Sequence, residues 1–436
     1  MKELIVAFIL ILIPILIALY LKNSSSSSSS SSSTQQQQQR NTHKQQQSTT
    51  TSTHVQQHAH VHAQQQQNDN SKEHLIKSFK DLKYMKHCLI HHNGHIIVFC
   101  DDKRISLLYF PKLTSKHHKI ISKNIDSDVI SDISYSETTR QIAVSSKNGK
   151  SIYFYVISSE STKNKLIKHQ NAIINTTRKY EIKNISIRKD GKYVITSGTD
   201  QDTEIQIYNT KTLKLVDKME TGGINNLEMK MNPNDNDIMI STFLNDISII
   251  HFDKSEKFNN ESKAYEVVEK ITRYKSVPSK KDKILGFEFS NDDMFFVVAC
   301  DKLIKIYQHY GNVSESKSFI EFNTTTTTGV VSLYVTSYVN GKLNGYVALS
   351  ENDTDIVIVD VYGKEVLRFT HAHDDSVIKL KLVKADTSYV DDDKEDISNV
   401  DLCKCEFNDV KDEQGDIMLI SAGKDGRIKV WNTKLN

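Results

Sequence analysis

Short segments in which apolar and polar residues alternate recur from about residue 71 to the C-terminus. Each ends in an aromatic or large aliphatic residue. Alternation with a period of two, together with many β-branched residues, predicts strands rather than helices. The seven segments are RISLL (104–108), SIYFY (151–155), EIQIY (204–208), DISII (246–250), LIKIY (303–307), DIVIV (355–359) and RIKVW (427–431).

Each recurring segment belongs to a longer unit. Two further apolar segments and two polar turns precede most of them, as in KYVITSGTDQDTEIQIY, and a short apolar stretch such as LKLV follows. The units therefore predict four strands each, and their spacing of about 42 to 72 residues is close to or above the ~40–45 of a propeller blade. Radial repetition protects the strand edges that an open sheet exposes. We expect an all-β, seven-bladed β-propeller over residues 71–436.

The last unit lacks a fourth strand, because the chain ends five residues after Trp431. An apolar segment at the other end, HLIKSFKDL (74–82), follows no unit of its own. We expect it to supply the missing outer strand, so that strands from the two ends of the propeller pair with each other.

An uncharged apolar run of eighteen residues occupies positions 4–21. As a helix it would extend roughly 27 Å, about the thickness of an endoplasmic reticulum bilayer. A cleaved signal peptide usually has a shorter apolar core of about 7–15 residues and small residues at its cleavage site. The run therefore favours an uncleaved transmembrane signal anchor over residues 1–22. Both flanks are weakly positive, so the sequence does not determine its orientation.

Residues 23–70 are rich in Ser, Gln and His and contain no aromatic residue except His. Such a composition cannot bury enough apolar surface to offset the entropy of ordering, which predicts a disordered linker. His54, His58, His60 and His62 could present imidazoles to a metal. Because no Cys or carboxylate nearby completes a ligand set, we expect a polar spacer and no metal site.

Composition excludes several classes of protein. Lys and Arg total 56 against 54 Asp and Glu, a net charge of +2, which argues against a surface built wholly for nucleic acid. Four Pro, 15 Gly and five Cys exclude collagen-like chains and disulfide scaffolds. A mean hydropathy of −0.46 with a single long apolar run excludes a multi-span membrane protein.

Motifs for catalysis are weak. SSKNGKS (145–151) imitates a phosphate-binding loop but lacks its first Gly and the helix that must follow. Cys403 and Cys405 have no second Cys pair for zinc. We therefore expect no enzyme activity and no cofactor. Cys100 and Cys300 end second-strand segments, where free buried thiols suit a reducing compartment and favour a cytosolic propeller; sequons such as Asn175 would be usable in a lumen.

Two segments carry opposite charge. Residues 384–413 hold eleven acidic and four basic residues, and we expect a solvated or disordered loop. The basic segment 270–283 is expected to be a loop on the opposite face, which is either solvated or contacts phosphate on lipid headgroups, RNA or a phosphoprotein. Its candidate contact residues are Lys270, Arg273, Lys275, Lys280, Lys281 and Lys283.

The last unit, HAHDDSVIKL followed by ISAGKDGRIKVWNTK, resembles the WD-repeat family. The resemblance implies a structural tetrad of His373, Ser421, Asp425 and Trp431, a hydrogen-bonded chain that serves folding rather than catalysis. Two residues depart from the family pattern: Ala372 replaces its Gly and Asn432 its Asp. The other six units lack Trp, and three of them carry Tyr in its place: Tyr155, Tyr208 and Tyr307.

The order of anchor, linker and repeats also resembles a narrower family, that of transducin beta-like protein two, with local similarity in INNLEMKMNP and ILGFEFSNDDMFF. This chain lacks the helical C-terminal extension of that family. The resemblance implies a non-enzymatic adaptor in the endoplasmic reticulum membrane, linked to stress signalling. Its implied partners are the stress-activated kinase of translation initiation factor two and translation components, and RNA is a weaker candidate.

We therefore expect a membrane-tethered scaffold for protein interactions, since a tether raises the effective concentration of a binding module near co-resident partners. Two alternatives stay open. One is a nucleotide-exchange regulator of a small GTPase at the endoplasmic reticulum. The other is a lumenal or secreted propeller, for which the N-terminal run would be cleaved.

Overall fold

The computed structural model describes residues 74–435, all within one unit of the chain, Gln66–Asn436. The gaps in this range are 81, 92–93, 111–112, 114–117, 126–128, 137, 147–150, 159–164, 179, 200–201, 221–225, 233–236, 243–245, 260–263, 279–281, 310–317, 386–404 and 408–415. The predicted anchor (1–22) and linker (23–70) lie outside the described residues. Within the described part, no helix is long and apolar enough to cross a membrane.

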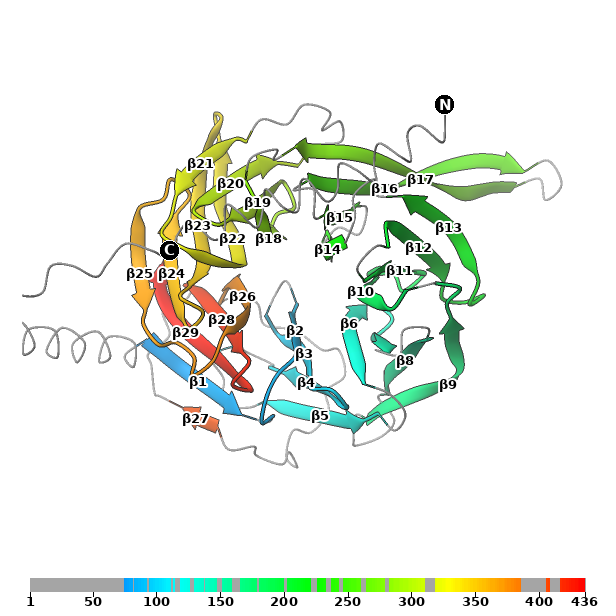
Figure 1. The fold of residues 1–436 in the computed structure, drawn as a ribbon, viewed down its shortest axis with the longest axis horizontal. Helices are drawn as coiled ribbons and strands as arrows, with labels where there is room; N and C mark the ends of the chain where they lie inside the picture. Colours follow the sequence, from blue (N-terminus) through cyan, green and yellow to red (C-terminus); the bar gives the residue numbers. More distant parts are fainter. Residues whose placement is uncertain are drawn as a thin grey trace, which may run out of the picture. The chain divides into compact units, whose positions relative to one another are not determined.

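In the described ranges every regular element is a β-strand, and all strand pairs are antiparallel (Figure 1). Six sheets contain four strands in chain order. The first three are β2 (His87–Ile90), β3 (Ile96–Cys100), β4 (Arg104–Tyr109) and β5 (Lys119–Asn124); β6 (Ile130–Ser136), β7 (Gln141–Ser146), β8 (Ser151–Ser158) and β9 (Lys165–Asn175); and β10 (Ile182–Ile187), β11 (Tyr193–Gly198), β12 (Glu204–Asn209) and β13 (Leu215–Glu220).

The next three four-stranded sheets follow the same order. They are β14 (Asn226–Met231), β15 (Asp237–Thr242), β16 (Asp246–Asn259) and β17 (Ala264–Pro278); β18 (Ile284–Phe289), β19 (Phe295–Cys300), β20 (Leu303–Gln308) and β21 (Ile320–Asn323); and β22 (Thr327–Val339), β23 (Lys342–Glu351), β24 (Asp355–Asp360) and β25 (Glu365–Phe369). All seven recurring segments are strands, as predicted: they form β4, β8, β12, β16, β20, β24 and β29.

The remaining sheet joins the two ends of the described chain. Its order is β26 (Val377–Lys384), β28 (Ile417–Gly423), β29 (Arg427–Leu435), β1 (Leu75–Lys80) and β27 (Cys405–Phe407). The prediction that residues 74–82 pair with the last strand is confirmed, because Phe79 lies opposite Ile428. β1 is not the outermost strand, however. Cys405, in the acidic insert, lies opposite Phe79 on its other side.

Apolar packing connects each sheet to the next. Strand residues alternate between the two faces of a sheet, so a sheet with neighbours on both sides buries both sets. The described residues form seven apolar clusters, each shared by two consecutive sheets, and one of them joins the five-stranded sheet to the β2–β5 sheet through Ile76, Phe79, Phe99 and Ile420. In Figure 1 the first strands lie nearest a common centre, an arrangement compatible with a β-propeller.

Polar side chains form hydrogen bonds with backbone groups along the inner edges of the first strands. In the described sheets, these edges have no neighbouring strand with which to form a regular ladder. Buried N–H groups without partners are costly, and here the preceding sheet supplies the acceptors. Examples among the described residues run from Ile185 N to Asp132 Oδ2 (2.9 Å), Ile187 N to Ser134 Oγ (2.9 Å), Phe287 N to Glu228 Oε2 (3.2 Å) and Leu382 N to Ser332 Oγ (3.0 Å).

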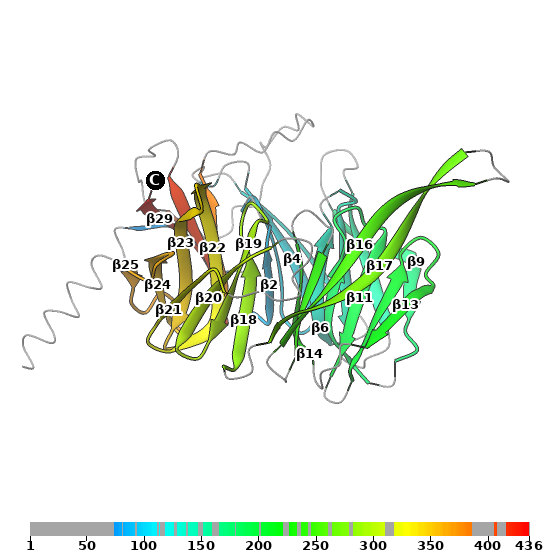
Figure 2. The same ribbon diagram turned by 90° about the horizontal axis from the view of Figure 1, so that it is seen from above.

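One hairpin is much longer than the others. β16 and β17 have 14 and 15 residues, and their paired register continues from Asp246 to Asn259. Figures 1 and 2 show this hairpin extending beyond the rest of its sheet. The loop expected over 270–283 is therefore wrong for residues 270–278. The sequence AYEVVEKITRY alternates and is rich in β-branched residues, which favours a strand.

Candidate functional site

The first strands of all seven sheets, β2, β6, β10, β14, β18, β22 and β26, contribute residues to one cavity of about 530 Å³. This volume is in the range of sites for small ligands and cofactors, roughly 300–1,000 Å³. Because each strand presents alternate residues to one face, two successive levels of side chains line the cavity.

The lining is unusually polar for the inside of a β-sheet protein. Four of the lining residues occupy equivalent positions in their sheets: Asp132, Asn184, Glu228 and Lys379. Each lies on a first strand, opposite the second-last residue of the second strand of the same sheet. Two residues later, the same strands present Ser134, Ser186, Lys230 and Lys381, and β18 adds Glu288. The sequence does contain a signal for this lining, because these polar positions alternate with buried apolar residues of the same strands.

Glu288 is the centre of an ionic cluster in the cavity. Lys379 Nζ lies 2.6 Å and Lys230 Nζ 3.2 Å from Glu288 Oε2, and Lys381 Nζ lies 3.8 Å from Oε1. Lys230 also pairs with Glu228 Oε1 at 2.8 Å and donates to the carbonyl of Phe287. Three ammonium groups thus face two carboxylates, a net excess of one positive charge.

The protonation of this cluster follows from burial and charge. Burial opposes ionisation of Glu288, but Lys230, Lys379 and Lys381 outweigh it and hold the pKa of Glu288 well below its usual range. For Lys230, the two carboxylates outweigh burial and raise the pKa. Lys381 differs: burial lowers its pKa, and Glu288 does not offset the loss of hydration. Lys381 is therefore the least compensated charge of the cluster.

A second ionisable pair lines the cavity. His87 Nδ1 lies 3.4 Å from Asp132 Oδ1, and Asp132 also accepts hydrogen bonds from the backbone N–H groups of Ile133 and Ile185. Burial raises the pKa of Asp132. The neighbouring thiol of Cys88 is no candidate nucleophile, because burial raises its pKa to about 12 and keeps it protonated.

The four residues of the predicted tetrad are brought together by hydrogen bonds. Asp425 accepts from Nδ1 of His373 at 3.1 Å, Nε2 of His373 lies 2.8 Å from Ser421 Oγ, and Trp431 Nε1 donates to the same oxygen at 2.9 Å. Burial lowers the pKa of His373, while His373 and backbone N–H groups overcome burial and lower the pKa of Asp425 to about 2. Ser421 is completely buried and the Trp431 N–H already occupies its oxygen, unlike an activated nucleophile.

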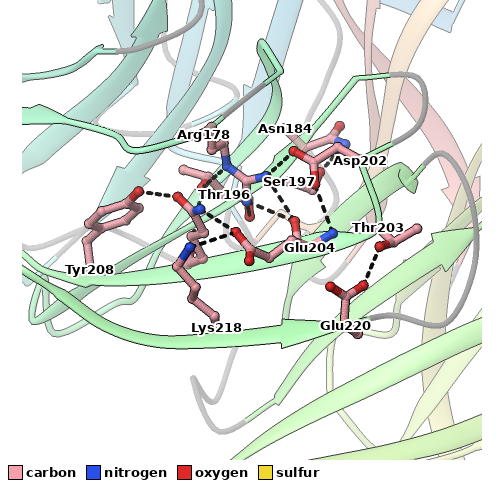
Figure 3. A network of polar contacts seen from close by, with 11 residues as sticks. Arg178, Asn184, Thr196, Ser197, Asp202, Thr203, Glu204, Tyr208, Lys218 and Glu220 are labelled. Carbon is pink, nitrogen blue, oxygen red and sulfur yellow. Dashed lines mark hydrogen bonds and ion pairs between the residues drawn. The ribbon is translucent and has the colours of Figure 1, made fainter.

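A similar network in the β10–β13 sheet was not predicted (Figure 3). Arg178 lies four residues before β10, as His373 lies four before β26. Its Nε donates to Thr196 Oγ1 at 3.0 Å and its Nη1 to Asp202 Oδ2 at 2.6 Å. Further donors reach the carbonyls of Thr196 (2.6 Å) and Glu204 (2.9 Å). Arg178 and Thr196 thus occupy the positions of His373 and Ser421 in a sheet without a tetrad His or Trp.

The predicted basic contact residues do not form one loop. Lys270, Arg273 and Lys275 lie in β17, opposite Asp253, Ile250 and Ser248 of β16. Lys280 and Lys281 lie outside the described residues, and Lys283 is exposed just before β18.

The described residues test only part of the predictions for the acidic insert and the cysteines. Of the insert 384–413, the structure describes residues 384–385 and β27. The expectation that Cys100 and Cys300 are buried cysteines outside disulfides is confirmed. Over the described part of the chain, no three His, Cys, Asp or Glu side chains gather as metal ligands would; the His residues of the linker lie outside it.

Asp293, in the turn after β18, should make stability depend on pH. Its Oδ1 is buried without a hydrogen-bond partner among the described residues, and burial raises its pKa to about 6 despite nearby Lys381. The folded state therefore binds more protons than the unfolded state between about pH 4 and 6, so stability falls as the pH rises through this window. Asp293→Asn should raise the free energy of unfolding by about 1–3 kcal/mol at pH 7.5.

Urea titrations of both proteins at pH 7.5 and pH 4 measure this difference. It should fall to well under about 1 kcal/mol at pH 4, where the carboxyl is protonated in the folded state and about half protonated in the unfolded state. Asn tolerates the left-handed backbone of this position, where φ is 60°. Asp353→Asn, at an exposed position with φ 64°, is the matched control and should change stability little at either pH. An equal gain at both pH values would contradict the assignment.

No protein-family model matches this chain, and no curated protein sequence matches it.

Proposed function

We propose that this chain is a non-enzymatic scaffold for protein interactions, built on a closed, seven-bladed β-propeller of the WD-repeat type. The closure is supported by the apolar clusters between consecutive sheets, by the pairing of β1 with β29, and by the cavity to which all seven first strands contribute. The tetrad contacts of His373, Ser421, Asp425 and Trp431 support the WD-repeat type.

The observation that carries the scaffold proposal is a patch of exposed apolar side chains, Phe319, Val339 and Tyr362, around the β22–β23 hairpin. Their exposed fractions are 36%, 60% and 52%. The ring of Phe319 lies 5.9 Å from that of Tyr338, next to Val339, and the Tyr362 hydroxyl donates to the carbonyl of Leu343, opposite Tyr338. Grouped, exposed apolar side chains mark protein interaction sites, unlike single ones.

We further propose that the apolar run at residues 4–21 tethers the propeller to the endoplasmic reticulum membrane, with the propeller in the cytosol. Cys88, Cys100 and Cys300, the described cysteines that form no disulfide, support a reducing compartment. The stress-activated kinase and translation components are the partners proposed from the family resemblance, and RNA is the weaker candidate.

Proximity labelling in cells with the full-length chain tests the patch. The double variant Val339→Asp/Tyr362→Ser should reduce labelling of the main neighbours about tenfold or more, because interface hot spots contribute about 2 kcal/mol or more. Val366→Asp is the matched control, since Val366 is 42% exposed on β25 outside the patch. Unchanged labelling by the patch variant, or an equal loss in the control, would reject this surface.

The tether is tested separately by labelling with a chain that begins at Ser71. Because a tether raises local concentration without new contacts, we expect this chain to lose membrane-resident neighbours while it keeps an intact patch. If both chains label the same neighbours, the tether is not part of the mechanism.

A further inference from the structure

We propose that the central cavity binds a small, hydroxyl-bearing phosphate monoester, with Lys379 and Lys381 holding the phosphate. This site is independent of the scaffold surface, because none of Phe319, Val339 and Tyr362 lines the cavity.

The first reason is charge. Five lysines line the cavity, Lys86, Lys189, Lys230, Lys379 and Lys381, and three carboxylates, Asp132, Glu228 and Glu288. Outside the lining, Asp293 lies close enough to Lys381 and Lys189 to interact with their charges. Asp102 pairs with Lys86 from outside the lining, but its side chain is half exposed, so solvent screens its charge. An excess of positive charge in a partly enclosed, low-dielectric site attracts anions.

The second reason is the environment of Lys381. Its side chain is almost completely buried, and its nearest ionic partner among the described residues, Glu288 Oε1, lies 3.8 Å away, beyond hydrogen-bond distance. A buried ammonium group needs acceptors to replace water. Phosphate oxygens are strong acceptors for lysine, and they could bind Lys381 while Lys379, two residues earlier on β26, faces the same cavity.

The third reason is an acceptor in the same cavity. Asn232 follows β14 and is 4% exposed, and its Oδ1 has no hydrogen-bond partner among the described residues. This oxygen would accept a hydrogen bond from a hydroxyl group on the organic part of the ligand. Inorganic phosphate has no such part, so it can bind the lysines without contacting Asn232. The volume of about 530 Å³ leaves room for a ligand larger than phosphate alone.

Calorimetric titration of the full-length chain, in detergent, with glucose 6-phosphate, inorganic phosphate and glucose tests the proposal. We expect glucose 6-phosphate to bind most tightly, phosphate more weakly, and glucose not at all. Lys381→Met, which removes the charge and keeps most of the volume, should weaken both phosphates about tenfold or more. Lys364→Met, at an exposed turn outside the cavity, is the matched control and should bind like the parent.

Asn232→Ala provides a second variant should Lys381→Met fold poorly, and it should weaken glucose 6-phosphate while leaving inorganic phosphate unchanged. Failure of both phosphates to bind the parent chain, or equal binding by Lys381→Met, would overturn the site. Equal binding of phosphate and glucose 6-phosphate, with no effect of Asn232→Ala, would overturn the hydroxyl contact. Neither result bears on the scaffold surface, which is read out by labelling.

Discussion

Phe79→Ala should lower the free energy of unfolding by about 3–5 kcal/mol, the usual cost of truncating a buried phenylalanine. Phe79 lies on β1 and is 2% exposed. Its ring centroid lies 5.2 Å from that of Phe110 and 4.8 Å from that of His118, both of the β2–β5 region. The side chain therefore links the five-stranded sheet, which holds both β1 and the last strands, to the β2–β5 sheet.

The loss would be a large part of the total stability of a typical domain, about 5–15 kcal/mol. Urea unfolding followed by the fluorescence of Trp431, the only tryptophan of the chain, measures this loss of stability. Trp431 reports on β1 because Leu75 of β1 lies opposite it. Lys80→Ala, at the exposed end of the same strand, is the control and should cost little. A loss below about 1 kcal/mol for Phe79→Ala would mean that β1 does not hold the two ends together.

The sequence predicted β1 because its pattern is local. Residues 74–82 are an apolar segment beside the first unit, and a last unit without a fourth strand left one partner open. The same local logic predicted the seven third strands. It missed β27 because three residues within an acidic insert carry no periodic signal, and their pairing with Lys77, Ser78 and Phe79 depends on where the insert returns in space.

The polar cavity lining was missed for a related reason. Asp132, Glu228, Glu288 and Lys379 are far apart in sequence, and only the repeated register of the first strands brings them to one space. Each charge on its own strand is consistent with an exposed face. Glu288 is buried and the other three are partly buried, and this burial follows from the surrounding sheets, not from any one segment.

Arg178→Met should lower the free energy of unfolding by about 3–5 kcal/mol, because removing one partner of a buried ion pair leaves the other charge without compensation. The Arg178 side chain is completely buried, the Asp202 side chain is only 8% exposed, and Asp202 Oδ2 lies 2.6 Å from Arg178 Nη1. The variant also removes the donors to Thr196 Oγ1 and to the carbonyls of Thr196 and Glu204. A surface arginine has no comparable role: Arg427→Met, whose pair with Asp374 is solvent-exposed, should cost at most about 1 kcal/mol.

A double-mutant cycle with Asp202→Asn separates the ion pair from the rest of the network. Urea unfolding of the two single variants and the double variant should give a coupling energy of about 0.5–3 kcal/mol, with the double variant less destabilised than the sum of the singles. Additive losses would mean that the guanidinium acts mainly through the backbone carbonyls. Among the described residues the His373 ring makes no such carbonyl contact. In that case Arg178 would hold the strands of its sheet through backbone carbonyls, where His373 uses side chains. Coupled losses would instead make Arg178 and Asp202 the ionic counterpart of the pair formed by His373 and Asp425.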